Sequence, residues 1–534
     1  MKFSSIDNKV FAKPSKIGKD LPLIAQIPFK DLEHAPTSVE ITPIACKTCG
    51  AVLTDVSAVR NDPNLGVYFT CPYCGGINKL ATMPGPLPGG SDVEFVIEKA
   101  GVVAGPEGKK KGLKGELVTS IIDISGSMGG GKLEAVKHNL VESLKDMIVN
   151  ASSSAYMLVT FESSVSLFFS PKEAAMVISD DKLLRSEKEL KDYIEKNCKK
   201  FDTQAVDKLG GSWIAQVRAL QVMGSTALGP ALAAGVFVFL ARRASGRILL
   251  LTDGLANVGF GRLEGDGARE GKAFYEGMAK TCLGNNIVVD VIGVGSGNEL
   301  ALDVLGKLSE YTGGELFFVT ESELGSTFSE LTQRQFVGKD VKVKVFTPKD
   351  IEVQQISGIS SVAQKAKRME EINIGSVTPD REAFIEFEVK DKLKSSQVPV
   401  QVQLEYKDAA GNKKLRVFKS MLKAEENEES YKKDYDPKLM SVMRIQQSGE
   451  MYSKGNTVQA QQILLETKAV FEAEKAKFSA GNAAPAMAFL DSELDQIDDL
   501  EAQKKTKAKA SFSAMAGQKR ARMSLDKKME ELKK

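Results

Sequence analysis

The sequence predicts a multidomain α/β, β and α protein: a four-cysteine zinc ribbon, a Rossmann-like parallel α/β domain, a β-sandwich and a C-terminal helical region. Three observations support this fold class. Two C-x-x-C pairs lie near the start, apolar strands then alternate with helices, and the apolar period changes to two after about Gly338. A chain of 534 residues has the length of about three or four domains.

Residues 1–40 are weakly patterned, and we expect an N-terminal extension there. Residues 41–82 form the predicted zinc ribbon, with the spacing C-x2-C-x21-C-x2-C for Cys46, Cys49, Cys71 and Cys74. In a cytoplasmic chain such pairs favour metal over disulfides. Four thiolates complete a tetrahedral Zn²⁺ shell and leave no position for water, so this zinc is expected to be structural. A disulfide pair and redox-active C-x-x-C units are the alternatives.

Residues 83–115 are predicted to hold a linker and one strand. The Pro/Gly-rich run Met83–Gly90 is typical of a linker. The apolar run Val93–Ile97 is expected to pair with the later β-sandwich, and a Gly/Lys-rich loop follows it.

Residues 116–338 carry the α/β pattern. Continuous apolar strands alternating with helices indicate a parallel sheet covered on both faces. The charged stretch Pro171–Trp213 is expected to be an insertion with a helix or two of its own. The strands and helices predicted most clearly are Tyr156–Phe161, Ile248–Leu251, Ile287–Val294, Leu316–Val319, Leu133–Val149 and Pro230–Ala244.

The last three segments differ in period and charge. Residues 339–424 alternate valines with polar residues, which predicts a β-sandwich. Residues 425–502 have a helical period, with Leu490, Leu494 and Ile497 on one face. Residues 503–534 form a basic tail with eleven Lys/Arg against three Asp/Glu. We expect the tail to be solvated or to contact an acidic surface.

A second metal site is predicted in the α/β domain. Asp123, Ser125 and Ser127 follow an apolar strand directly, at the carboxyl end where open α/β sheets bind ligands. Their oxygens suit Mg²⁺ or Mn²⁺. Two further loops, which carry Thr226 and Asp253, are positioned to complete the shell. The glycine-rich run Gly126–Lys132 is not expected to bind nucleotide, because a P-loop needs Ser or Thr where residue 133 is Leu.

These residues carry a family resemblance. D-x-S-x-S, then Gly224-Ser225-Thr226, then Thr252-Asp253-Gly254 after a strand resemble the metal-ion-dependent adhesion site (MIDAS) of von Willebrand factor type A domains. The resemblance implies that Ser125, Ser127 and Thr226 bind the ion directly, with Asp123 and Asp253 close by or acting through water. It also implies that a partner protein supplies an acidic residue to the free position. The alternative is a domain of this fold whose polar loops bind no ion.

The order of modules carries a second resemblance. A four-cysteine ribbon, the strand Val93–Ile97, a trunk of this fold, a sandwich and then helices resemble the inner-shell subunits of the COPII vesicle coat. This resemblance implies a coat component in ER-to-Golgi transport that binds a second coat subunit and a small GTPase. We find no obvious gelsolin-like domain after the helices, a departure from that family.

We expect a non-catalytic interaction scaffold or adaptor that binds partners through the divalent-metal site beside the zinc ribbon. A COPII-like coat component is one alternative, and a metal-dependent enzyme subunit or ubiquitin-ligase-like protein is another. An enzyme is disfavoured because the only two histidines, His34 and His138, are isolated and no nucleophile has a base.

Charge and hydropathy bear on location. Lys+Arg total 72 and Asp+Glu total 70, so the net charge is +2 and the whole chain has no strong field for nucleic acid or anionic lipid. No apolar run reaches the roughly 18 residues that cross a bilayer. The start lacks the apolar segment of a signal peptide. We expect a cytoplasmic protein with at most peripheral contacts to membranes or cytoskeleton.

Overall fold

The computed structural model describes residues 6, 8–34, 38–40, 42–85, 87, 90–99, 116–150, 154–198, 205–254, 256–263, 267–295, 302–358, 367–453, 456–479, 483–503 and 524–531. The chain divides into two compact units. One comprises residues 1–104, 335–499 and 517–534, and the other comprises residues 105–334 and 500–516. The second unit therefore interrupts the first in sequence.

The interrupting unit, the trunk, is built on a seven-stranded sheet in the order β11-β10-β9-β8-β12-β13-β14. The five strands from β9 to β14 in this order run parallel, and β10 and β11 add antiparallel at one edge. This confirms the predicted parallel sheet. The strands are β8 (Leu117–Asp123), β9 (Ala155–Phe161), β10 (Val165–Phe168), β11 (Met176–Ile178), β12 (Gly246–Thr252), β13 (Ile287–Val294) and β14 (Leu316–Val319).

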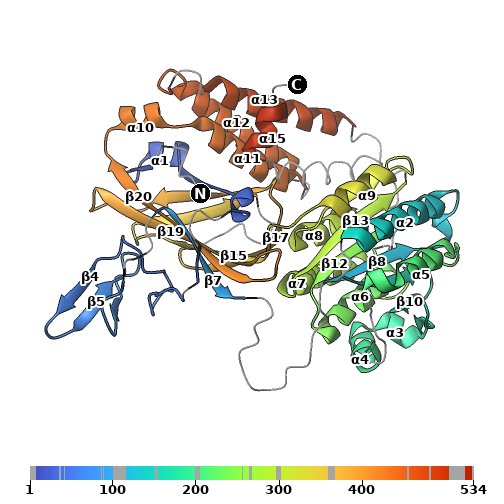
Figure 1. Ribbon diagram of the computed structural model, residues 1–534. Coiled ribbons are helices and arrows are strands. Elements are labelled where there is room, and N and C mark those ends of the chain that lie inside the picture. Colours follow the sequence, from blue (N-terminus) through green and yellow to red (C-terminus); the bar gives the residue numbers. More distant parts are fainter. Residues whose placement is uncertain are drawn as a thin grey trace. The chain divides into compact units, whose positions relative to one another are not determined.

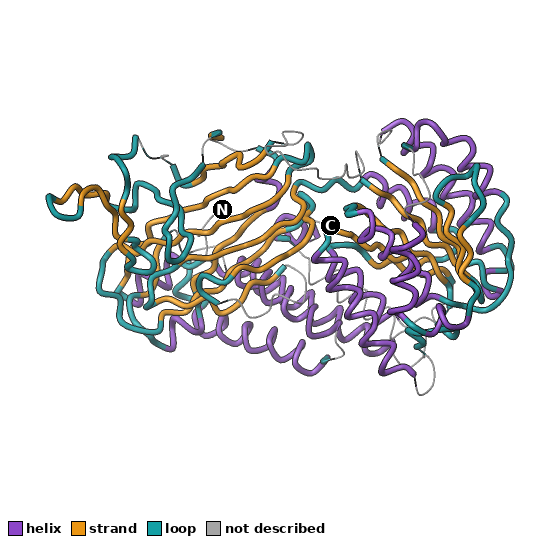
Figure 2. The backbone as a smooth tube through the Cα atoms, turned by 90° about the horizontal axis from the view of Figure 1, so that it is seen from below, coloured by secondary structure: helices purple, strands orange, loops and turns teal. Residues whose placement is uncertain are grey.

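Helices flank the trunk strands on both sides, as Figure 2 shows. Two separate apolar cores result, one including α6 and α7 residues and the other α2 and α5 residues. Buried strands covered on both faces account for the nearly continuous apolar runs in the sequence. The helices are α2 (Lys132–Asn150), α3 (Asp181–Arg185), α4 (Glu187–Asn197), α5 (Val206–Arg218), α6 (Leu228–Arg242), α7 (Ala268–Gly284), α8 (Leu302–Thr312) and α9 (Leu324–Gln333).

The other unit contains the sandwich. One sheet has the order β17-β15-β19-β20-β7-β3 with β1 paired to β20, and the second has the order β16-β18-β2. Period-two alternation places Val341, Val343 and Val345 in the core. The strands from the predicted sandwich segment are β15 (Gly338–Phe346), β16 (Ile351–Ser357), β17 (Glu371–Val377), β18 (Glu382–Val389), β19 (Gln397–Lys407) and β20 (Lys413–Glu425).

The first hundred residues complete these sheets. The strand β7 (Asp92–Glu98) pairs antiparallel with β20, which confirms the expected pairing of Val93–Ile97 with the sandwich. The N-terminal extension contributes more than was predicted: β1 (Lys9–Phe11), β2 (Leu23–Pro28) and β3 (Ser38–Val39) all join a sheet. Between β1 and β2 lies the short helix α1 (Lys16–Asp20), capped by the Ser15 hydroxyl.

The cysteine module has a small sheet of its own, with β4 (Val59–Asp62), β5 (Gly66–Thr70) and β6 (Ile77–Lys79) in sequence order. Its core is small and includes Phe69, Tyr73 and two of the cysteines. About 40 residues rarely stabilise a fold without a metal or disulfides.

The helices α10 (Glu428–Asp434), α11 (Pro437–Ser453), α12 (Thr457–Glu474), α13 (Ala483–Gln503) and α15 (Leu525–Glu531) follow the sandwich in sequence and lie to one side of it (Figure 1). Helix α11 contacts β16 and β2. On α13, Leu490 and Ile497 are buried as predicted, whereas Leu494 is only half-buried, and the same face also buries Glu493.

Part of the predicted basic tail folds back onto this unit. Lys528 of α15 is fully buried and lies 3.7 Å from the Glu493 carboxylate, while Lys527 donates to Asp380 at 2.6 Å. A solvated tail is therefore wrong for residues 524–531, because a buried acid on α13 supplies a counterion. The other basic residues of the tail lie outside the described residues. Within the described part of the chain, no helix is long and apolar enough to cross a membrane.

Candidate metal centres

Each C-x-x-C pair lies on a tight turn. The Gly50 amide donates to the Cys46 carbonyl at 2.8 Å, and the Gly75 amide donates to the Cys71 carbonyl at 2.9 Å. Gly50 and Gly75 have φ values of 85° and 76°, in the left-handed region that glycine adopts without steric cost. The two turns therefore aim their thiols at one point.

The four sulfurs have the spacing of a metal tetrahedron. All of them lie within 4.8 Å of one another, with 3.6 Å between Cys46 and Cys74 and 3.7 Å between Cys49 and Cys71. A tetrahedron with Zn–S bonds of about 2.3 Å has edges of about 3.8 Å. A disulfide needs sulfurs about 2.05 Å apart, so these thiols are not paired as disulfides. The donor set and its geometry fit Zn²⁺.

Hydrogen bonds favour a thiolate in this cluster. Burial opposes ionisation of Cys46, but amide hydrogen bonds from Cys49 and Thr48 and a bond from Asn78 lower the Cys46 pKa to about 6. Burial raises the pKa of Cys71 to about 11 and also raises that of Cys49. Two thiols buried together resist ionisation unless a cation compensates their charge.

Asn78 was not predicted from the sequence. Its amide nitrogen donates to the Cys46 sulfur at 3.3 Å and to the Gly76 carbonyl at 3.0 Å, and its oxygen accepts from the Lys47 amide at 2.8 Å. It is 3% exposed. This one side chain joins the two cysteine turns, and an asparagine seven residues after the first cysteine of a pair gives no sequence signal for that role.

The cysteine module packs on the sandwich. The Gln401 carboxamide accepts from the Val52 amide at 2.9 Å and donates to the Val52 carbonyl at 3.0 Å, as a neighbouring strand would. Gln403 donates to the Gly50 carbonyl at 3.1 Å, and Phe346 packs against Tyr73. A metal that orders the module therefore also orders its contact with β15 and β19.

The second predicted site lies at the carboxyl ends of β8 and β12. The Gly126 amide donates to the Gly224 carbonyl at 3.0 Å, which joins the first and second loops. The Thr226 amide donates to the Asn257 side chain at 2.9 Å, which joins the second loop to the segment after β12. Hydrogen bonds therefore join the first loop to the second, and the second loop to the segment after β12.

The side chains of these loops converge. Asp123 accepts from the Ser125 amide at 2.9 Å and from the Thr252 hydroxyl at 2.6 Å. Ser127 lies 3.0 Å from the Ser125 hydroxyl and donates to Asp253 at 2.7 Å. Burial raises the Asp123 pKa to about 6, despite the hydrogen bonds from Ser125 and Thr252.

Thr226 borders the same space, since a side chain built at Gly254 would lie 3.7 Å from the Ser127 hydroxyl and 3.8 Å from that of Thr226. Three hydroxyls and two carboxylates are a donor set that suits Mg²⁺ or Mn²⁺. All five predicted residues are thus brought together.

A lysine also enters this cluster. Lys132, the first residue of α2, donates to Asp253 at 2.5 Å and to the Ser127 carbonyl at 3.1 Å. The Asp253 side chain is fully buried, while that of Lys132 is 27% exposed. The cluster therefore holds its own cation. In the sequence, Lys132 ends the glycine-rich run Gly126–Lys132, which was not expected to bind nucleotide. Its position in that run did not predict an ion pair with Asp253.

The remaining residues singled out in the sequence have structural places. Cys198 and Cys282 are fully buried in the trunk core, and burial raises the Cys282 pKa to about 12. Trp213 packs edge-on against Tyr156. The His34 carbonyl accepts from Arg416.

Comparison with known proteins identifies both large domains. Residues 119–336 match the Sec23/Sec24 trunk domain, and residues 338–424 match the Sec23/Sec24 beta-sandwich domain. The human COPII-coat protein Sec24c has a similar fold, with a TM-score of 0.71 and 16% identity, covering 98% of this chain and 75% of that one.

Two curated proteins are similar in sequence. Circularly permutated Ras protein 1 of Dictyostelium discoideum is 23% identical over 414 residues, 71% of this chain and 48% of that protein. Protein transport protein SEC24-2 of Naumovozyma castellii is 25% identical over 340 residues, 56% of this chain and 35% of that protein. The chain thus spans about half the length, or less, of these relatives.

Proposed function

We propose that this chain, which carries the trunk and β-sandwich domains of the Sec23/Sec24 type, is a COPII-like coat protein that acts as a non-catalytic scaffold at a membrane surface. The observation that carries the proposal is the uninterrupted succession of both family domains over residues 119–336 and 338–424. These matches reverse the ranking of functions drawn from the sequence. The coat component, first an alternative, takes precedence over a scaffold defined by its metal site.

A coat role implies particular partners and a location. The proposed partners are a second coat subunit and an activated small GTPase, on the cytoplasmic face of a membrane. A scaffold role agrees with the cysteine cluster, because a closed thiolate shell leaves no position for a substrate.

Co-sedimentation tests this proposal. The full chain is mixed with liposomes that carry a COPII-type small GTPase in its GTP-locked or its GDP-bound form, with and without a Sec23-type subunit. We expect the chain to sediment with the GTP-locked form when the second subunit is present. Equal sedimentation with both nucleotide states would contradict a coat role.

The zinc ribbon is proposed to be a structural support for the sandwich. Cys46, Cys49, Cys71 and Cys74 would hold Zn²⁺, which compensates the charge of the buried thiolates. When bound, the metal fixes both cysteine turns. Asn78 would orient Cys46 through its hydrogen bond to the sulfur, and the hydrogen bonds between Gln401 and Val52 would hold the module against β19.

A second interaction is proposed at the trunk, where five oxygen-bearing side chains converge. Ser125, Ser127 and Thr226, with Asp123 and Asp253 nearby, would hold Mg²⁺ or Mn²⁺. A bound ion would supply a positive centre for an acidic residue of a partner. Substituting Asp123→Ala is expected to abolish Mg²⁺-dependent partner capture in pull-downs, and EDTA should do the same for the unsubstituted chain. Capture that is indifferent to EDTA would refute this interaction without affecting the coat proposal.

A further inference from the structure

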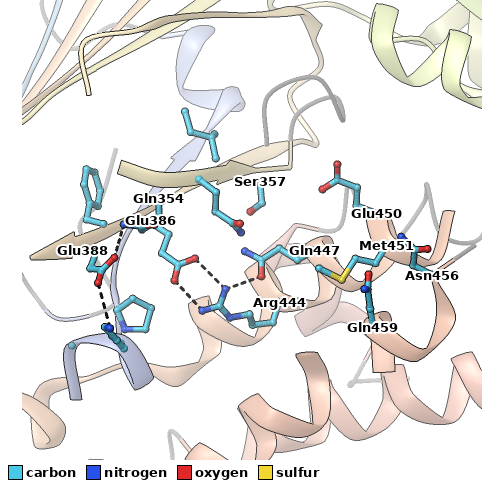
Figure 3. A pocket seen from close by; sticks show the side chains of 16 residues that line it. Gln354, Ser357, Glu386, Glu388, Arg444, Gln447, Glu450, Met451, Asn456 and Gln459 are labelled. Atoms are coloured by element: carbon cyan, nitrogen blue, oxygen red, sulfur yellow. Dashed lines mark hydrogen bonds and ion pairs between the residues drawn. The ribbon is translucent and has the colours of Figure 1, made fainter. Parts of the chain in front are cut away.

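The polar pocket in Figure 3, which residues of β16, β18 and α11 line, belongs to the sandwich unit, and its main charged side chains pair with one another. Arg444 of α11 donates to both carboxylate oxygens of Glu386 at 3.0 Å and to the Gln447 oxygen at 2.7 Å. Arg444 and Glu386 therefore leave no free charge for a ligand. The oxygen cluster of the trunk differs from this pocket, because one of its five side chains has no hydrogen-bond partner.

That side chain is Thr226. Among the residues that the structure describes, its hydroxyl makes no hydrogen bond, although Thr226 is only 4% exposed. Side-chain hydrogen bonds hold the other four members of the cluster, which are Asp123, Ser125, Ser127 and Asp253. A metal ion would gain the Thr226 oxygen without breaking an internal hydrogen bond. The position of this oxygen must therefore be set through the backbone of Thr226.

The backbone of Thr226 is held by Asn257, on the segment that follows β12. The Thr226 amide donates to the Asn257 side-chain oxygen at 2.9 Å. In return, the amides of Asn257 and Val258 donate to the Thr226 carbonyl at 3.1 and 3.2 Å. Asn257 lies four residues after Asp253 in the sequence, so these three hydrogen bonds tie the position of Thr226 to that of the carboxylate on the other side of the cluster.

The segment after β12 packs closely against the first turn of α6, which begins two residues after Thr226. A side chain at Gly229 would lie 2.2 Å from the Phe260 carbonyl oxygen, and one at Gly259 would lie 2.6 Å from the Pro230 ring. Gly259 also has a φ of 78°, which glycine adopts without steric cost. Because the segment has no spare room on this side, it is a firm support for the residue that it holds.

The residues on either side of Thr226 have separate anchors in the turn after β9. The Ser225 amide donates to the Ser163 hydroxyl at 3.0 Å, and the Ala227 amide donates to the Glu162 carbonyl at 2.7 Å. These hydrogen bonds do not involve Asn257, which is itself exposed. Loss of the Asn257 side chain should therefore loosen Thr226 and leave the loop and the fold in place.

We infer that Asn257 is a positioning residue that holds Thr226 for a small divalent ion and gives the trunk site a preference for Mg²⁺ over Ca²⁺. Mg²⁺ requires near-ideal octahedral geometry with oxygens at about 2.0–2.1 Å, whereas Ca²⁺ accepts flexible arrangements with oxygens at about 2.3–2.6 Å. A fixed Thr226 oxygen therefore matters more for Mg²⁺ than for Ca²⁺. This role rests on the trunk metal site proposed above and does not depend on the coat function.

Asn257→Ala is the direct test, because alanine removes the oxygen that accepts from the Thr226 amide and leaves the net charge unchanged. Asn257→Asp keeps an oxygen in the same position. Its added charge attracts both ions, so the ratio of their dissociation constants is compared. Asn285→Ala is the matched control. Asn285 is an exposed asparagine of the trunk that also bonds to one backbone group, the Thr281 carbonyl at 2.8 Å, but lies beside the start of β13, at the opposite end of the sheet.

Calorimetric titration of the full chain with Mg²⁺ and, separately, with Ca²⁺ measures both affinities. Asn257→Ala should raise the Mg²⁺ dissociation constant about three- to tenfold, since one hydrogen bond is lost, and the Ca²⁺ constant by a smaller factor. Asn257→Asp and Asn285→Ala should keep the ratio of the unsubstituted chain. Hydrogen exchange should show a less protected Thr226 amide in Asn257→Ala, while the Ser125 amide, which donates to Asp123, stays as it was.

The same titrations distinguish the role of Asn257 from the metal site itself. An unsubstituted chain that binds neither ion would refute the trunk metal site and, with it, this role. If the unsubstituted chain binds Mg²⁺ and Asn257→Ala binds it equally well, or loses affinity for both ions by the same factor, only the role of Asn257 is overturned. An equal loss of Mg²⁺ affinity in Asn285→Ala would also overturn it, because the loss would then reflect the stability of the trunk.

Discussion

Lys132 should compete with a divalent ion for the trunk site, and replacing it with methionine should strengthen metal binding. Methionine keeps most of the aliphatic length of lysine but has no charge. In the structure the Lys132 ammonium donates hydrogen bonds to the Asp253 carboxylate at 2.5 Å and to the Ser127 carbonyl at 3.1 Å. An ion that uses Asp253 or water held by it must first displace this ammonium.

The magnitude follows from the contact that is lost. A hydrogen bond to a charged group stabilises by about 1.5–3 kcal/mol. Lys132 is 27% exposed, so water screens part of its charge and the lower end applies. About 1.4 kcal/mol corresponds to a tenfold change in affinity, and we therefore expect Mg²⁺ or Mn²⁺ to bind about tenfold more tightly to Lys132→Met.

Calorimetric titration of the full chain with Mn²⁺ and then Mg²⁺ measures the effect. Lys145→Met is the matched control, because Lys145 lies on the same helix, carries the same charge and, among the residues that the structure describes, pairs with the exposed Glu142 alone. Its dissociation constant should equal that of the unsubstituted chain. An unchanged or weaker affinity for Lys132→Met would show that the ammonium does not oppose the metal.

Three further predictions concern stability. Cys71→Ser should release zinc, which a chromogenic chelator measures, and should make residues 41–82 sensitive to protease. The reason is that a structural zinc contributes about 10–16 kcal/mol of apparent binding free energy. A ribbon that resists protease as before would contradict this prediction. Glu493→Leu should destabilise the chain by about 3–5 kcal/mol in urea unfolding, because it leaves Lys528 charged and buried. The double variant Glu493→Leu with Lys528→Met should recover most of this loss. A double variant that recovers nothing would mean that the two residues are not coupled. Burial opposes ionisation of Asp380, but hydrogen bonds from Lys527 and Thr378 lower its pKa from 3.8 to about 2. Its contribution to stability is therefore present above about pH 4 and lost as the pH falls toward 2, and hydrogen exchange in α15 should rise over that interval in the unsubstituted chain but less in Lys527→Met.

The sequence predicted those parts of the fold that are encoded by local periodicity. Continuous apolar runs located β8, β12 and β13, because strands buried on both faces are apolar throughout. Alternating valines located β15, because a strand buried on one face is apolar at every second residue. The strand β2 was missed, since Leu23–Pro28 is short, includes a proline and takes its place only through pairing with β18, which comes about 350 residues later.

In the candidate sites too, the residues that could be predicted were those whose role depends on nearby sequence. Thiol and hydroxyl ligands are recognisable because their spacing on one turn determines where they point. Asn78 and Lys132 were not, because each acts on a group from a distant segment of the chain. Lys528 was counted as part of a basic tail for the same reason, since its counterion Glu493 lies on another helix.

The interruption of the sandwich unit by the trunk has a consequence for synthesis on the ribosome. Asp92 of β7 forms its ion pair with Arg416 of β20, 324 residues later in the chain. At about 5–20 residues per second, β7 leaves the ribosome roughly 15–65 seconds before its partner strand exists. During that interval the trunk has the local contacts needed to fold, whereas β2 and β7 expose apolar faces and unpaired edges. We therefore expect the N-terminal segment to need protection from premature association during translation.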